Sequence, residues 1–321
     1  MKNSAKVRDS EILSVDRRTQ SEMLPEYSDG RFFISPVLGC SAHCSYCYIY
    51  SEGFGSNVCK NPLSIGRLIS WLESHERFRL GRKGSILSVG AWGDPFAPEV
   101  SVEVTLELIR QLSALGNPIQ LITKYPITED VLDALAKVSL YRGHLLFSTS
   151  IVSITNWQSI DPKVSSPENR LKMLARMENR QIPTNLMIKP FLRGITDIDT
   201  VIFKRELMLN RVTSCVVGVL YWNAKIAERI YGSTHDHNTF TKMLRNRILD
   251  HGLVCRPASI YRTFSGEAMD GFCAELMDAG IRVFKNASCV SAWLTDTRHV
   301  SGLRQSDPLG LCVNCENAAC Q

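Results

Sequence analysis

The stretch "GCSAHCSYCY", residues 39 to 48, places three cysteines within eight residues. Cys40, Cys44 and Cys47 are separated by three and then by two residues. The stretch follows "RFFISPV" (31–37), a short apolar run that is typical of a buried strand. Thiols this close in a loop are more typical of one shared metal centre than of separate packing. We therefore expect a metal or iron–sulfur site just after the first strand.

The composition is that of an ordinary globular protein. The chain has 321 residues, of which 44% are hydrophobic and 21% charged. No apolar run approaches the roughly 20 residues that cross a bilayer, and the polar N-terminus lacks the apolar stretch of a secretory signal. We therefore expect a cytoplasmic protein without membrane association. The net charge of +5 is compatible with an anionic substrate or a nucleic acid but argues for neither.

Short apolar runs alternate with amphipathic segments from residue 31 onward. The predicted strands are 31–37, 85–90, 118–123, 144–150, 184–190 and 214–222. The predicted helices are 62–78, 101–116, 128–138 and 166–180, with Pro62 in a first turn and Ser101, Thr128 and Ser166 as start signals. This alternation implies parallel strands with right-handed crossovers, in an α/β barrel or a doubly wound sheet.

Three regions follow from these patterns. Residues 1–30 show little periodicity and are expected to form an N-terminal arm. Residues 31–232 carry the strand–helix alternation. Residues 233–321 become helical and irregular and end in a second cysteine group, so we expect a C-terminal extension packed on the α/β unit.

The number of cysteines in the first group distinguishes two kinds of centre. Zinc takes four ligands, and His43 is the candidate fourth, but His43 adjoins Cys44 on a short loop. A [4Fe–4S] cluster has four irons, so three cysteines leave one iron free to coordinate a substrate or cofactor.

The spacing Cys40-x3-Cys44-x2-Cys47, with Tyr46 before the last cysteine, resembles the signature of the radical S-adenosylmethionine (SAM) superfamily. The resemblance covers roughly residues 31 to 222 and implies a partial (β/α)6 TIM-type barrel. It also implies that the free iron binds SAM. An electron donor of the flavodoxin or ferredoxin type reduces the cluster, and SAM is then cleaved to a 5′-deoxyadenosyl radical that abstracts a substrate hydrogen.

The resemblance also implies a set of SAM contacts at the ends of the strands. Lys124, in "LITKYP", would pair with the SAM carboxylate, although a solvated loop lysine is the alternative. The serines of "FSTS" would contact the ribose or carboxylate, or else cap the next turn. The full expected set is Tyr46, Tyr48, Gly90, Gly93, Asp94, Lys124, Ser148, Ser150 and Lys189. No residue is assigned to the chemistry on the substrate.

The segments "GDPFAPE", "ITKYPITEDVLDAL" and "SSPENRLKMLARMENR" look most like the spore photoproduct lyase-like branch of this superfamily. The lyase itself donates hydrogen from a cysteine just ahead of the Asp-containing second-strand segment. The corresponding stretch here, "SILSVGAWGD" (85–94), contains no cysteine. Cys59 lies in a different loop. We therefore do not expect repair of DNA photoproducts.

The second cysteine group, "LCVNCENAACQ", contains Cys312, Cys315 and Cys320. The same spacing argument predicts a metal site, with Cys289 or Cys273 as a fourth ligand. An auxiliary [4Fe–4S] cluster and a structural zinc ion are both compatible with it.

Three functions remain compatible with the sequence. The first is a radical SAM enzyme that acts on a small-molecule biosynthetic intermediate or a peptide. The second is a radical SAM enzyme that modifies a nucleotide or nucleic acid. The third is a non-catalytic protein in which both cysteine groups bind zinc and support partner binding.

Overall fold

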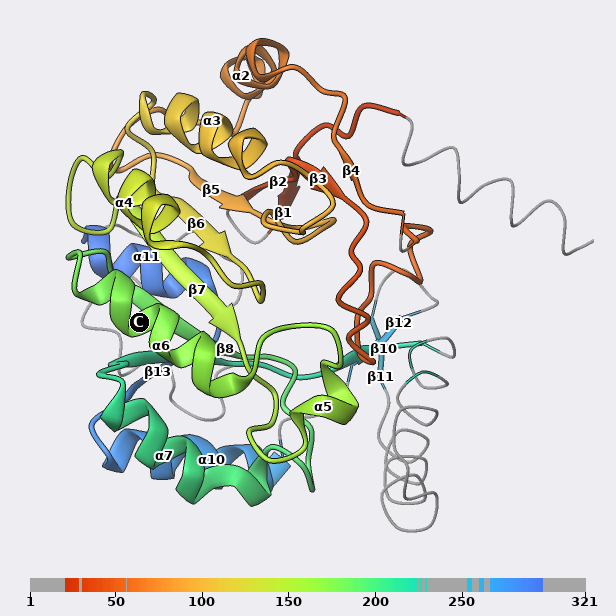
Figure 1. Ribbon diagram of the computed structural model, residues 1–321, viewed down its shortest axis with the longest axis vertical. Coiled ribbons are helices and arrows are strands. Elements are labelled where there is room, and N and C mark those ends of the chain that lie inside the picture. Colours follow the sequence, from red (N-terminus) through yellow and green to blue (C-terminus); the bar gives the residue numbers. More distant parts are fainter. Residues whose placement is uncertain are drawn as a thin grey trace, which may run out of the picture.

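A mostly parallel eight-stranded sheet forms the centre of the molecule (Figure 1). The computed structural model describes residues 21–28, 31–55, 57–223, 226, 229, 253–255, 260–262 and 266–296. In the order of the sheet, the strands are β1 (Glu26–Ser28), β2 (Arg31–Ile34), β5 (Ile86–Val89), β6 (Ile119–Ile122), β7 (Leu145–Ser150), β8 (Thr184–Ile188), β9 (Ser214–Val217) and β13 (Arg282–Phe284). Every neighbouring pair from β2 to β13 is parallel, and β1 is antiparallel to β2.

The described helices are α2 (Ile65–Ser74), α3 (Val102–Ser113), α4 (Glu129–Lys137), α5 (Trp157–Ile160), α6 (Pro167–Glu178), α7 (Thr200–Leu209), α10 (Gly266–Asp278) and α11 (Ala287–Thr295), with a 3-10 turn η1 (Asp197–Asp199). The helices α3, α4, α6 and α7 each connect two neighbouring parallel strands. This is the strand–helix alternation that the sequence predicts, and the predicted α/β fold is confirmed.

The helix starts follow the predicted caps in most places. The Ser166 hydroxyl accepts a hydrogen bond from the Asn169 amide, and Pro167 occupies the first turn of α6. Thr128 is the N-cap of α4. The prediction for Pro62 is wrong, because α2 begins at Ile65 and its N-cap is Ser64, whose hydroxyl accepts from the amide of Arg67.

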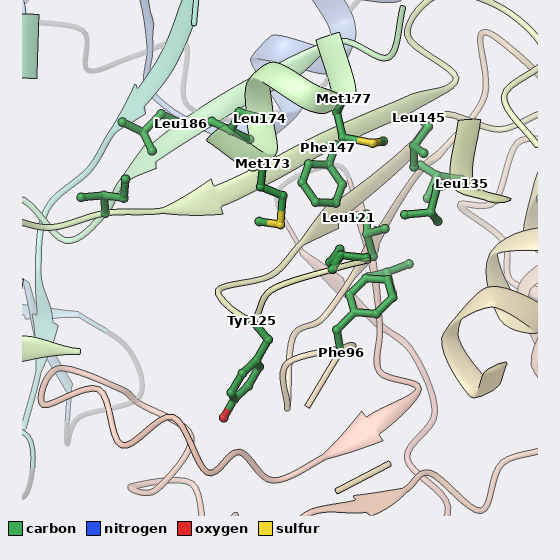
Figure 2. Packing of buried hydrophobic residues seen from close by; sticks show 14 of the residues in the cluster. Phe96, Leu121, Tyr125, Leu135, Leu145, Phe147, Met173, Leu174, Met177 and Leu186 are labelled. Carbon is green, nitrogen blue, oxygen red and sulfur yellow. The ribbon is translucent and has the colours of Figure 1, made fainter. Parts of the chain in front are cut away.

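The two faces of the sheet pack against different elements, because successive side chains of a strand point to opposite sides. Phe147 of β7 is buried in the large core cluster that also contains Met173 and Met177 of α6, and Figure 2 shows the three side by side. Its neighbour Leu146 belongs to a second cluster with Val290 of α11. The helix α11 therefore covers the face of the sheet opposite to α6.

Two predicted strands are interrupted. The run 31–37 divides into β2 and β3 (Val37–Leu38), since Pro36 lacks the amide that would continue the ladder. The run 214–222 divides into β9 and β10 (Tyr221–Trp222). The short strands form two small sheets: β3 pairs with β4 (Cys59–Lys60), and β10 pairs with β12 (Ile260–Arg262), which also pairs with β11 (Leu253–Cys255).

The segments at the two ends of the predicted barrel also join the main sheet. In the predicted N-terminal arm, residues 26–28 form β1 at one edge. In the predicted C-terminal extension, β13 pairs with β9 at the other edge. The boundaries at residues 30 and 232 stay predictions. Within the described residues, no helix is both long and apolar enough to cross a membrane.

Candidate active site

The first cysteine group lies on the loop that follows β3, at the carboxyl-terminal edge of the parallel strands (Figure 1). Cys40 and Cys44 are buried, and Cys47 is partly exposed. Gly39, at the start of this loop, has a φ of +79°. A Cβ on Gly39 would lie 2.3 Å from the carbonyl oxygen of Asn57, so only glycine fits this turn. The sequence therefore brings its three thiols to the edge where α/β enzymes place their sites.

Hydrogen bonds from several elements hold this loop. The Tyr50 hydroxyl donates to the carbonyl of Cys40 at 2.6 Å, and the amide of Ser45 donates to the carbonyl of Ile160 in α5 at 2.9 Å. The guanidinium of Arg229 donates to the carbonyl of Cys47 and lies over the ring of Tyr50. The backbone of the loop is thus fixed largely by groups other than the thiols.

A buried group of charged side chains lies directly against the loop. The Lys124 ammonium, just beyond β6, donates to Asp161 Oδ1 at 2.9 Å, to Cys44 Sγ at 3.3 Å and to the hydroxyl of Tyr46. Arg170 of α6 donates to Asp161 Oδ2 at 3.0 Å and to the carbonyl of Ser150. The side chains of Arg170 and Asp161 are 0% and 2% exposed, respectively. One carboxylate therefore faces two cations in a site shielded from water.

The pKa shifts follow from this arrangement. Burial alone would raise the pKa of Asp161, but Lys124 and Arg170 outweigh it, and the pKa is lowered. Burial would lower the pKa of Lys124, but Asp161, with Cys44 and Tyr46, raises it well above its usual value. Burial and the Asp161 carboxylate raise the pKa of the Cys44 thiol, and burial with Asp94 raises that of Cys40 to about 12. In the absence of a metal, both thiols keep their protons at neutral pH.

The residues present fit a multi-iron centre better than a single ion. Among the described residues, no three His, Cys, Asp or Glu side chains converge closely enough to hold one metal ion. His43 is exposed, and its ring contacts Tyr50, so it does not complete a zinc site. A [4Fe–4S] cluster binds each thiolate at a different iron, so its ligand sulfurs lie farther apart than the ligands of a single ion do. Nitrogen donors also reach two of the sulfurs: Ala42 N lies 3.5 Å from Cys40 Sγ, and Lys124 Nζ contacts Cys44 Sγ.

The predicted second-strand residues lie beside this group. Asp94 accepts from the Thr123 hydroxyl at 2.6 Å and from the Lys124 amide at 2.8 Å, so it fixes the start of the loop that carries Lys124. Gly90 has a φ of +107°, which favours glycine. Gly93 packs against the chain that enters the cysteine loop: a Cβ there would lie 2.5 Å from the carbonyl oxygen of Gly39.

The other expected SAM contacts are distributed along the same edge. Ser148 and Ser150 are buried at the end of β7, and the Ser150 hydroxyl donates to the carbonyl of Lys189 at 3.2 Å. The side chain of Lys189 lies along Gly218. Tyr48 is 45% exposed, and its hydroxyl donates to the carbonyl of Ala91 at 2.7 Å. The structure thus groups Tyr46 with Lys124, whereas Tyr48, Ser150 and Lys189 bond to other partners. Their contacts with SAM stay predictions.

The second cysteine group falls outside the described residues, since Cys312, Cys315 and Cys320 all lie beyond residue 296. The two candidates for its fourth ligand are described. Cys289 is buried in the first turn of α11, where its Sγ lies 3.3 Å from Asn286 Oδ1. Cys273 is buried in α10, and burial raises the pKa of its thiol to about 12. The auxiliary site stays a prediction.

Sequence reasoning missed Asp161, Arg170 and Arg229. A signal for Arg170 was available, because it lies between apolar positions on the buried face of α6, together with Leu171 and Leu174. An arginine on such a face requires an acidic partner. The partner, Asp161, is nine residues earlier and follows α5, a short helix that the sequence pattern does not predict.

Replacing Gly93 with Ala should destabilise the cysteine loop. The new Cβ would lie 2.5 to 2.6 Å from the carbonyl oxygens of Gly39 and Val37, which are backbone atoms and cannot swing away. We expect a loss of about 1 to 3 kcal/mol in the free energy of unfolding, measured by urea denaturation. Gly66→Ala in α2 is the matched control, because its Cβ would meet nothing within 4 Å. Helix propensity predicts no loss there. Equal effects of the two changes would contradict this packing role.

No family model matches the sequence, and no curated protein sequence matches it. Solved structures do match. Spore photoproduct lyase complexed with dinucleoside spore photoproduct superposes with a TM-score of 0.62 at 15% identity, covering 83% of this chain and 79% of that one. This chain has the fold of spore photoproduct lyase. A mutant of the same lyase gives a TM-score of 0.64 at 13% identity, covering 88% and 87% of the two chains.

These matches confirm the predicted fold, an α/β partial barrel. Another mutant of spore photoproduct lyase has bound AdoMet and dinucleoside spore photoproduct, and it superposes with a TM-score of 0.61 at 14% identity over 80% of this chain and 78% of that one. At this level of identity, the structural likeness shows the fold alone. The activity has to be inferred from the residues of the site.

Proposed function

We propose that this protein is a radical SAM enzyme. Cys40, Cys44 and Cys47 would hold a [4Fe–4S] cluster, and SAM would bind at its free iron. When bound and reduced, the cluster supplies the electron that cleaves SAM to a 5′-deoxyadenosyl radical, and this radical abstracts hydrogen from the substrate. The electron would come from a flavodoxin or ferredoxin type of donor.

One observation carries the proposal. The three cysteine thiols lie at the carboxyl-terminal edge of the parallel strands, against a buried group of two cations and one carboxylate. Among the described residues, none joins these thiols to form a site for a single metal ion. SAM carries a carboxylate. The Nε and Nη2 atoms of Arg170 are buried without a hydrogen-bond partner in the described part of the chain. The excess of positive charge in this buried group, two cations to one carboxylate, favours an anionic group of the cofactor.

The chain's own residues would position the cofactor and exclude water. Asp161 holds Lys124 and Arg170 in fixed positions, and Asp94 fixes the backbone on which Lys124 lies. These charged side chains are themselves largely shielded from bulk water, and exclusion of water would protect a reactive radical from side reactions. Gly93 and Gly39 allow the close backbone approach that brings the loop to this edge.

The substrate that we propose is a small-molecule biosynthetic intermediate or a peptide. The absence of a cysteine from residues 85–94 is the reason for not proposing photoproduct repair. A nucleotide is the second candidate, because spore photoproduct lyase, which has this fold, is complexed with a dinucleoside.

The proposal is tested by anaerobic reconstitution of the full chain. We expect about four irons and four sulfides for the first cysteine group, with broad brown absorption. With SAM and a strong reductant, the reconstituted protein should form 5′-deoxyadenosine, which liquid chromatography detects. A colourless protein that holds stoichiometric zinc at both cysteine groups would instead support the non-catalytic alternative.

A further inference from the structure

The contact between Lys124 and Cys44 has a consequence for the electron transfer that the proposed function requires. Lys124 Nζ donates a hydrogen bond to Cys44 Sγ at 3.3 Å, and its side chain is 13% exposed. Cys44 is one of the three expected cluster ligands. Hydrogen bonds to ligand sulfurs and nearby charge are two of the factors that set the reduction potential of an iron–sulfur cluster.

The position of the ammonium is fixed by the rest of the group. An ammonium has three N–H bonds, and those of Lys124 go to Cys44 Sγ, Asp161 Oδ1 and the hydroxyl of Tyr46. Asp161 is itself held by Arg170, which is fully buried in α6. The chain Arg170–Asp161–Lys124 therefore directs one N–H of the ammonium at the sulfur.

The sign of the effect follows from charge. Reduction adds a negative charge to the cluster and its thiolates, and a positive group against a ligand sulfur stabilises the reduced state. Low exposure weakens screening by water, so the effect is larger than that of a surface lysine. Lys124 therefore favours reduction of the cluster.

We propose that Lys124 is a positioning residue that raises the reduction potential of the cluster through its hydrogen bond to Cys44, with Asp161 and Arg170 holding it in place. This inference rests on the proposed function, since it requires a cluster on Cys40, Cys44 and Cys47. It differs from the SAM-carboxylate contact that the family resemblance implies for Lys124, because it concerns a bond to the chain's own sulfur.

The test is an anaerobic redox titration of the reconstituted full-length chain, followed by electron paramagnetic resonance without SAM. Cys312, Cys315 and Cys320 are replaced by Ala, so that only the first cysteine group contributes. In Lys124→Met, we expect the ratio of reduced to oxidised cluster at a fixed potential to fall roughly tenfold, because a charged hydrogen bond is lost. Lys124→Gln retains an N–H donor but not the charge, and should give a smaller fall. Lys124→Gln also decides the question if the Met variant does not fold.

Lys163→Met is the matched control. Lys163 is exposed on the same side of the molecule, where burial and then the charge of Lys163 lower the pKa of His43, and no hydrogen bond joins Lys163 to a cysteine within the described residues. We expect its reduced fraction to change less than about twofold. The inference is overturned if both Lys124 variants shift the ratio no more than Lys163→Met does. If the parent chain forms no iron–sulfur cluster at all, the proposed function fails first, and the two failures are thereby distinguished.

Discussion

Replacing Asp161 with Asn should lower the free energy of unfolding by about 3 to 5 kcal/mol. Asp161 is the carboxylate that Lys124 and Arg170 share, and its side chain is 2% exposed. Asn has nearly the same shape, so little packing is lost. The change leaves two buried cations next to each other without their counter-charge, and removal of one partner from a buried pair is costly for this reason. The measurement is urea denaturation of the metal-free protein.

Glu275→Gln provides a matched surface control. Glu275 pairs with Lys204 at 2.6 Å, which is shorter than the distance between Lys124 and Asp161, but its side chain is 55% exposed. A solvated pair of this kind contributes little, so we expect a change within about 1 kcal/mol. If Asp161→Asn costs no more than Glu275→Gln, the buried group is not a desolvated charge cluster, and the account of how Lys124 is held is wrong.

The second large effect concerns cluster binding. Replacing Cys44 with Ala should remove one of the three thiolate ligands, and the first cysteine group should then fail to retain a stable [4Fe–4S] cluster. Cys44 is buried against Lys124, and among the described cysteines no other thiol accepts a hydrogen bond from that ammonium, so no spare thiol replaces it there. We expect iron and sulfide at this group to fall close to background in a chain that also lacks Cys312, Cys315 and Cys320.

Cys59→Ala is the control for this experiment. Cys59 lies in β4, where its backbone is paired with Leu38, close in the fold to the cysteine loop but outside the expected ligand set. The iron content of the Cys59→Ala variant should equal that of the parent chain. A loss of iron in Cys59→Ala equal to that in Cys44→Ala would show that the ligand set has been assigned incorrectly.

The fold was predictable from the sequence because its strands and helices have strong, separate patterns. Runs such as 118–123 and 144–150 are buried, and Ser166 caps its helix through its hydroxyl as the capping rules state, while Thr128 occupies the N-cap position of α4 without a side-chain hydrogen bond. The parts that were not predictable depend on tertiary contacts. The strand β1 has a mixed, partly polar sequence and exists through its pairing with β2. The break in the strand at Pro36 could be placed only by knowing which backbone amides take part in the ladder.

The candidate site was predictable only in part, for a related reason. The cysteines lie within one short stretch, so their spacing carries the information. Asp161 and Arg170 are 37 and 46 residues from Lys124 in the sequence, and their contact depends on how α6 packs against β7. His43 is the opposite case. Its position in the motif suggested a metal ligand, but in the structure it has a positive φ, is exposed, and its ring contacts that of Tyr50.

Reductive cleavage of SAM at the first cysteine group can be tested directly. Its most direct measurement is the amount of 5′-deoxyadenosine formed by the reconstituted parent chain and by Cys44→Ala under the same reductant. We expect product from the parent chain and none above background from Cys44→Ala. Equal product from both chains, or none from a parent chain that holds zinc at this group, would contradict this expectation.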